Sequence, residues 1–239
     1  MNKDYTKVLW KIEELWKKYF TGVEAITDYS DVLDNYENNT SKYYDDFHLV
    51  DSFDFTASNE SVHVDDYGSY QGLLHSQLVF KDKPTYLFDN HNKMLYSLVE
   101  LYNINNKELT VVHIDAHPDD AKFQGQKITE LNLQNIKKYI AETRISDFYD
   151  ALSETNIIEK ILLVTHSDSF EFFLPPEEPY ILSLDIDIFG PEGDFCDLED
   201  KVRATALAWS MADAVCIATS PGFIDQKFAQ EIIEIFIHN

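Results

Sequence analysis

Basic residues are scarce in this sequence. Its 239 residues include 19 Lys and Arg against 43 Asp and Glu, which gives a formal net charge of −24. A surface of this sign repels the phosphates of nucleic acids and of anionic membranes, so we expect neither as a partner. The charge is compatible with a cationic substrate and equally with simple solubility.

Cysteines and long apolar runs are also few. The two cysteines, Cys196 and Cys216, are too few for a disulfide framework and are expected to be buried thiols. No apolar run is long enough to cross a bilayer. The first twenty residues lack the apolar block of a signal peptide. We therefore predict a cytoplasmic location.

Strand and helix patterns alternate from about residue 80 onward. An amphipathic helix is predicted at 5–20, and the acidic, Tyr-rich stretch at 28–66 is predicted to be a long excursion that ends by about residue 75. The strands expected beyond it are PTYLFDNH, ELTVVHID, KILLVTHSDS, PYILSLDID and AVCIATSP. The expected helices are KMLYSLVELYN, ITELNLQNIKKYIAETR, LEDKVRATALAWSMADA and DQKFAQEIIEIFIH. This alternation predicts an α/β fold with three α/β/α layers and a mainly parallel sheet.

Polar residues follow several of the predicted strands, at the point where each strand ends. In open parallel sheets, binding sites lie outside the carboxyl ends of the strands. We therefore expect these side chains to be able to converge on one crevice: Asp89, His91, Asp115, His117, Asp119, His166, Asp168, Asp185 and Asp187.

Two of these segments carry candidate ligands at a spacing of two. Asp185 and Asp187 lie at i and i+2 on a predicted strand and should point to the same face, and Asp115 and His117 should do likewise at the end of theirs. Burying several carboxylates together is costly unless cations neutralise them. Mixed carboxylate and imidazole ligands suit a divalent transition metal such as Mn²⁺. A water shared by two such ions has a lowered pKa, so hydrolysis is the expected chemistry. Aspartates at strand ends also cap helices, which is the structural alternative.

The two segments resemble the signatures of the ureohydrolase superfamily, which includes arginases, agmatinases and histone-type deacetylases. Those signatures are D-A-H-x-D and S-x-D-x-D. This sequence has DAHPD at 115–119 and SLDID at 183–187, in the same order and each after an apolar strand. An earlier segment, DNH, offers His91. The resemblance covers about residues 80–239 and implies a single arginase-like domain over residues 1–239.

The resemblance also implies a site with two Mn²⁺ ions. One ion would be held by His91, Asp115, Asp119 and Asp185. The other would be held by Asp115, His117, Asp185 and Asp187. Asp115 and Asp185 would then bridge the two ions.

The string AHPDD, at 116–120, also resembles a motif of N-acetylglucosamine-type deacetylases. Those enzymes carry it near the N-terminus, followed by Glu, with a paired-histidine motif downstream. Here Ala121 follows and no H-x-x-H occurs, so this alternative is disfavoured.

The segments LFDNHNKML and IATSPGFID differ from ordinary arginases and resemble the peptide arginases, which convert arginine residues in ribosomally made peptides to ornithine. The guanidinium-binding Glu of arginases is not apparent, and Asp225 is its nearest substitute, although Asp225 could equally cap the last helix. Asp120 is a further candidate for binding the substrate. His166 could protonate the leaving amine, or be a histidine with a purely structural role at a strand end.

The leading hypothesis is therefore a manganese-dependent hydrolase that acts on arginine in a precursor peptide and releases urea. One alternative is a hydrolase of a free guanidine compound or an amide deacetylase of the same fold. Another is a binding protein that has kept the fold without the chemistry. Arginase relatives commonly assemble, so a homo-oligomer is possible.

Overall fold

A seven-stranded sheet forms the centre of the computed structural model, which describes residues 5–20, 47–55, 72–73, 75–80, 82–130, 132 and 135–238. The strands are β1 (His48–Leu49), β2 (Gln77–Phe80), β3 (Pro84–Phe88), β4 (Leu109–Ile114), β5 (Ile158–Val164), β6 (Ile181–Asp185) and β7 (Ala214–Ala218). They lie in the order β1-β2-β3-β7-β6-β4-β5. Only β2 and β3 pair antiparallel, so the predicted mainly parallel sheet is confirmed.

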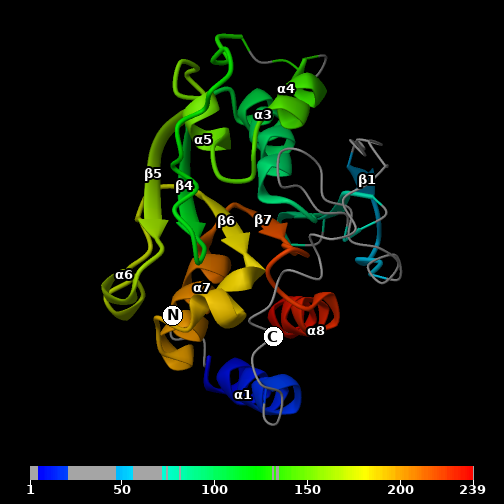
Figure 1. Ribbon diagram of the computed structural model, residues 1–239, viewed down its shortest axis with the longest axis vertical. Coiled ribbons are helices and arrows are strands. Elements are labelled where there is room, and N and C mark those ends of the chain that lie inside the picture. The colour runs from blue at the N-terminus through cyan, green and yellow to red at the C-terminus, as the bar shows by residue number, and fades with distance from the viewer. Residues whose placement is uncertain are drawn as a thin grey trace.

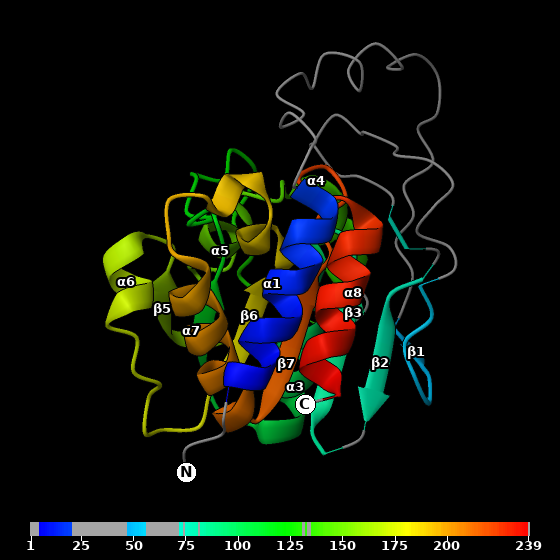
Figure 2. The same ribbon diagram turned by 90° about the horizontal axis from the view of Figure 1, so that it is seen from below.

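Helices cover both faces of this sheet (Figure 1). The α-helices are α1 (Thr6–Phe20), α3 (Met94–Asn105), α4 (Ile136–Glu142), α5 (Phe148–Ala151), α6 (Ser167–Glu171), α7 (Leu198–Met211) and α8 (Gln226–Ile237). Short 3-10 helices occupy η2 (His91–Lys93), η3 (Ile186–Phe189) and η4 (Pro191–Gly193). Figure 2 shows α1, α7 and α8 in front of one face, while α3, α4 and α5 cover the other. The three-layer α/β/α architecture is therefore confirmed.

Two apolar cores follow from the alternation of side chains along each strand. Val112 and Leu182 point into the core beneath α1, α7 and α8. Their neighbours Val111 and Ile181 point into the core beneath α3, α4 and α5. Because the central strands are buried on both faces, their sequences are nearly continuous apolar runs. Both cysteines are buried and free, as expected.

The helix predicted at 128–144 is shorter than expected and begins only at Ile136. The side chains of Asn132 and Asn135 each accept a hydrogen bond from the other's backbone N–H, at 3.0 and 3.1 Å. Asparagine competes with helical hydrogen bonding in this way, so a polar turn precedes the helix.

The predicted strand through residue 187 was also wrong in its last two residues. It ends at Asp185, whose side chain accepts a hydrogen bond from the backbone N–H of Asp187 at 3.0 Å and so starts η3. The acidic excursion falls largely on residues 28–46 and 56–71, which lie outside the described residues; β1 lies within 47–55.

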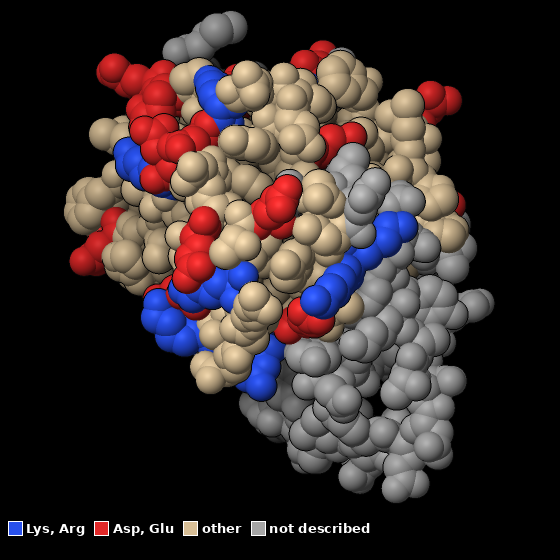
Figure 3. Space-filling model, turned by 90° about the horizontal axis from the view of Figure 1, so that it is seen from above, with Lys and Arg blue, Asp and Glu red and all other residues tan. Residues whose placement is uncertain are grey.

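Charge is not uniform on the described surface. Figure 3 shows acidic and basic side chains side by side in several places on the face seen from above, with wide uncharged areas between these charged groups. None of the helices in the described ranges is long and apolar enough to cross a membrane.

Candidate metal centre

The carboxyl ends of four adjacent strands, β3, β7, β6 and β4, meet at one edge of the sheet. The chain leaves β4 towards α4 and α5 but leaves β6 towards α7, so these neighbouring strands connect to opposite faces. Such a reversal opens a crevice outside the strand ends. His91 follows β3, Asp115 follows β4, Asp185 ends β6 and Ser220 follows β7.

The same local turn follows β4 and β6. Asp115 Oδ1 accepts a hydrogen bond from the backbone N–H of His117 at 2.7 Å, and Asp185 Oδ1 does so from that of Asp187 at 3.0 Å. An aspartate that bonds the backbone two residues later forms an Asx-turn, which ends the strand. The Asx-turn bends the chain at the end of each strand. It brings the side chain two residues later to the same site, which explains the functional groups at a spacing of two. The two turns touch, since Ala116 N–H donates to Asp187 Oδ1 at 3.4 Å.

His91 lies close to three carboxylates in the first group of candidate ligands. Its Nδ1 lies 2.9 Å from Asp115 Oδ2, 3.1 Å from Asp119 Oδ2 and 3.4 Å from Asp185 Oδ2. Ligand atoms of His91, His113, Asp115 and Asp119 all lie within 4.8 Å of one another, and all four residues are buried.

His117 lies close to two carboxylates in the second group of candidate ligands. Its Nδ1 lies 3.4 Å from Asp115 Oδ1 and 3.0 Å from Asp187 Oδ2. Asp115, His117 and Asp187 again have ligand atoms within 4.8 Å of one another. Asp115 therefore belongs to both groups, which places two possible ion positions side by side.

The raised pKa values of Asp119 and Asp187 show that their charged forms are unfavourable in the metal-free protein. Burial, together with the nearby Asp115, raises the pKa of Asp119 to about 7. Burial and the neighbouring Asp185 raise the pKa of Asp187 well above its ordinary value. Asp115 is the exception: burial raises its pKa, but hydrogen bonds with His117 and His91 outweigh this and hold it below the ordinary range.

The pKa values of His91 and His117 are also raised, but for a histidine this favours the charged form. Burial lowers the pKa of His91, but the carboxylates of Asp115, Asp119 and Asp185 outweigh this and raise it well above 6.5. Hydrogen bonds with Asp115 and Asp187 raise the pKa of His117 to about 11. Protons on these rings therefore neutralise the cluster in the metal-free protein, at positions that a metal ion would take.

The residues fit a divalent metal. Four buried aspartates converge with His91 and His117, and the ion pairs of this cluster in the described chain involve only histidines. Oδ2 of Asp187 is buried, and His117 Nδ1 lies 3.0 Å from it. A buried carboxylate is costly unless a cation neutralises it, and a metal ion can take this role when the histidine is neutral. A site rich in carboxylate with some imidazole suits Mn²⁺ and its neighbours in the first transition row.

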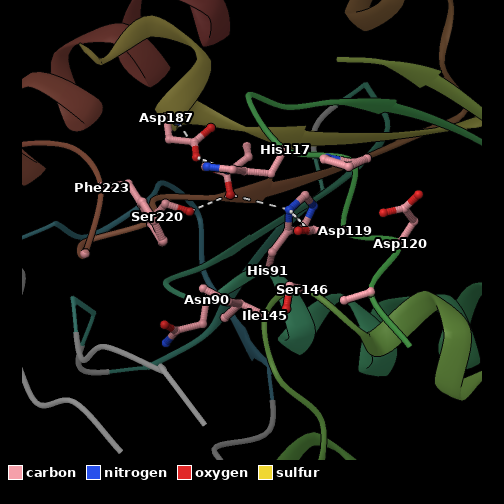
Figure 4. Close-up of a pocket in the computed structure, with 14 residues that line it drawn as sticks. Asn90, His91, His117, Asp119, Asp120, Ile145, Ser146, Asp187, Ser220 and Phe223 are labelled. Carbon is pink, nitrogen blue, oxygen red and sulfur yellow. Dashed lines mark hydrogen bonds and ion pairs between the residues drawn. The ribbon is translucent and has the colours of Figure 1, made fainter. Parts of the chain in front are cut away.

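A pocket of about 420 Å³ opens beside the cluster. Figure 4 shows His91, His117, Asp119 and Asp187 together at its base, with Asp120 set apart from them. Its remaining lining comes from loops that follow β3, β4, α4 and β7, including Asn90, Ile145, Ser146, Ser220 and Phe223. The ring of Phe223 lies 5.2 Å from that of His117.

The six metal ligands expected from the resemblance come together here: His91, Asp115, His117, Asp119, Asp185 and Asp187. Asp120 lines the pocket and is exposed. His166 and Asp225 do not line it. His166 is exposed at the start of α6, and the side chain of Asp225 caps α8 by accepting from the Phe228 N–H at 2.9 Å.

Two other strand-end residues lie elsewhere. Asp89 is buried outside the pocket lining, with its Oδ1 2.7 Å from Lys93 Nζ. Asp168 is exposed in α6.

The sequence reasoning missed His113 and Ser220. His113 lies two residues before Asp115 on β4, so the alternation of side chains along a strand would have placed it on the same face. Ser220 donates a short hydrogen bond to Asp185 Oδ2. Its φ of 45° is left-handed, as is that of Asp119 at 47°. Such conformations are uncommon for residues other than glycine and cluster at functional sites.

Comparisons of this chain with protein-family models, with curated proteins and with solved structures find no match.

Proposed function

We propose that this chain is a manganese-dependent hydrolase of the ureohydrolase superfamily. Its substrate would be arginine within a ribosomally made peptide, which it converts to ornithine with release of urea. The observation that carries the proposal is the buried cluster of aspartates and histidines at the base of a pocket. The motifs DAHPD and SLDID, which resemble the superfamily signatures, supply five of these residues.

We infer that two Mn²⁺ ions would bind at this cluster, with the ligand sets that the resemblance implies, in which Asp185 joins both groups. His91, Asp115, Asp119 and Asp185 would hold one ion, and Asp115, His117, Asp185 and Asp187 the other. When bound, the ions supply Lewis acidity that lowers the pKa of water and makes it a nucleophile near neutral pH.

The described pocket lining contains four aspartates and two histidines among its charged or ionisable residues, which suits a cationic group. None of the described residues that line it is Lys or Arg. The α-carboxylate of free arginine would therefore have no Lys or Arg partner there, whereas an arginine inside a peptide carries no such charge. The exposed carboxylate of Asp120 can attract the guanidinium group, and Phe223 provides an apolar surface for the side-chain stem.

The reaction adds one water to the guanidinium group. A C–O bond forms at the guanidinium carbon, the bond from that carbon to Nε breaks, and Nε leaves as the amine of ornithine after taking up a proton. Urea is the second product, and one positive charge remains on the peptide. In this scheme Ser220 holds Asp185 in place, and Ile145 and Phe223 limit the access of bulk water.

Mass spectrometry tests this proposal. The purified chain, supplied with Mn²⁺, is offered free arginine and arginine-containing peptides. We expect the peptides alone to lose mass, by the mass of urea less that of the water added in the reaction. Conversion of free arginine would instead identify a small-molecule arginase. No conversion of either would contradict the proposal and favour an amide deacetylase or a non-catalytic protein.

An Asp185→Ala variant is the matched control for this assay. It removes a carboxylate assigned to both ions and should abolish turnover while leaving the fold intact. Activity that survives the substitution would show that the site is wrongly placed.

A further inference from the structure

A fully buried polar network lies behind His91, on the side away from the carboxylates. His91 Nε2 lies 2.7 Å from Ser183 Oγ. Ser183 Oγ is in turn 3.2 Å from His113 Nδ1 and 3.1 Å from the hydroxyl of Tyr149. His113 and Ser183 are both 0% exposed. Buried polar groups of this kind need hydrogen-bond partners, and the neighbouring side chains supply them.

His113 contacts both histidines of the candidate metal centre. Its ring stacks on that of His91, with centroids 5.0 Å apart and an interplanar angle of 25°. Its Nε2 lies 3.1 Å from the backbone carbonyl oxygen of His117. One buried ring therefore spans the two ligand groups.

The carbonyl of His117 fixes the position of the proton on His113. A carbonyl can only accept, so Nε2 of His113 must carry the proton. The Nδ1 of a neutral His113 then accepts a hydrogen bond, and the hydroxyls of Ser183 and Tyr149 both lie 3.2 Å from it. When the Ser183 hydroxyl donates to this Nδ1, Ser183 Oγ accepts from His91 Nε2–H and from the Tyr149 hydroxyl. This arrangement satisfies every group.

In this arrangement Nδ1 is the nitrogen of His91 that is available to a metal ion. Because Nε2 of His91 carries a proton, its Nδ1 can present a lone pair towards Asp115, Asp119 and Asp185. Histidines that bind metals usually need such a partner on the other nitrogen to fix tautomer and ring orientation.

We propose that His113 is a positioning residue of the metal centre. Through Ser183 it fixes the tautomer of His91, and through the carbonyl of His117 it holds the turn that carries the second histidine ligand. The inference rests on the metal centre of the proposed function, but not on the identity of the substrate.

Titration of the metal-free protein with Mn²⁺, in competition with a chelating dye, tests this role. His113→Phe keeps a ring and removes both hydrogen bonds. Loss of a partner of this kind lowers metal affinity by about 10- to 100-fold. Tyr149→Phe is the matched control, because it removes a hydroxyl from the same network but leaves the chain from His91 to His117 unbroken. It should lose clearly less affinity than His113→Phe.

Two conservative variants separate the two links. His113→Asn places an acceptor near the position of Nδ1 and can keep the bond from Ser183. His113→Gln places a donor near the position of Nε2 and can keep the bond to the carbonyl of His117. We expect each to retain more affinity than His113→Phe. If His113→Phe fails to fold, as judged by circular dichroism without metal, this pair decides the question.

Nitrogen-15 NMR of the Zn²⁺-bound protein gives a direct readout of the tautomers. The proton should reside on Nε2 of both His113 and His91. A proton on Nδ1 of His113, or unchanged Mn²⁺ affinity in a folded His113→Phe variant, would overturn this inference and leave the proposed function standing. A wild-type chain that binds no divalent metal would overturn both.

Discussion

Replacing Asp119 with asparagine should stabilise the metal-free protein and weaken its binding of metal. Asp119 is buried, and its Oδ2 lies 3.1 Å from His91 Nδ1. Asparagine has nearly the same shape and adopts the left-handed backbone that Asp119 has, with φ of 47°, more readily than most residues. The substitution therefore removes a charge with little change in packing.

The size of the effect follows from the pKa of Asp119, which burial and Asp115 raise from 3.8 to about 7. Between these two values the folded protein holds a proton that the unfolded chain has lost. Stability therefore falls as the pH rises from about 4 to about 7. A shift of roughly 3 units corresponds to at most about 4 kcal/mol. Asparagine carries no charge at any pH, so the variant should not show this loss.

Urea unfolding in the presence of EDTA, followed by circular dichroism at pH 5 and pH 8, measures this difference. We expect the Asp119→Asn variant to gain stability over the wild type mainly at pH 8. Asp120→Asn is the matched control, because the neighbouring carboxylate is exposed. A variant that is no more stable than the wild type at pH 8 would refute the reasoning on repulsion. Unchanged Mn²⁺ affinity would refute the role of Asp119 as a ligand.

Three further predictions concern the same site. Binding of Mn²⁺ should release protons, because His117, with a pKa of about 11, is protonated at neutral pH in the metal-free protein; calorimetry in buffers of different ionisation enthalpy measures this, and no release would contradict the arrangement. Ser220→Ala removes the hydrogen bond to Asp185 and should weaken Mn²⁺ binding by about 10-fold or more in a dye-competition titration; an unchanged affinity would mean that this bond does not orient the carboxylate. Asp120→Asn should raise KM for arginine peptides and leave Mn²⁺ affinity unchanged. Asp225→Asn, at an exposed helix cap, should change neither quantity. A raised KM in the Asp225 variant alone would mean that Asp225, and not Asp120, binds the substrate.

The location of the site was predictable because strand ends are visible in the sequence. Apolar runs that stop at Asp89, Asp115 and Asp185 indicate three strands, and the carboxyl ends of parallel strands share one edge of a sheet. The spacing of two residues also led to the prediction that both residues of each Asx-turn belong to the site. The turn itself was not predicted, and it is the reason that Asp187 faces the cluster from η3 rather than from β6.

The lateral order of the strands could not be predicted, and it decides which strand ends meet. His166 follows β5, which is an outer strand among the described strands, with β4 as its one neighbour there, so this histidine lies away from the pocket. Ser220 follows β7, which lies between β3 and β6, and therefore reaches Asp185. Asp225 lies far enough beyond the end of β7 to cap α8 instead.

Anomalous diffraction from crystals grown with Mn²⁺ tests the central claim most directly. A difference map recorded at the manganese edge should show two peaks side by side, both within coordination distance of Asp115 and Asp185. His91 and Asp119 should complete one site, and His117 and Asp187 the other. A map with no peak in this cluster, or with ions bound only elsewhere on the chain, would contradict the assignment of a binuclear metal centre.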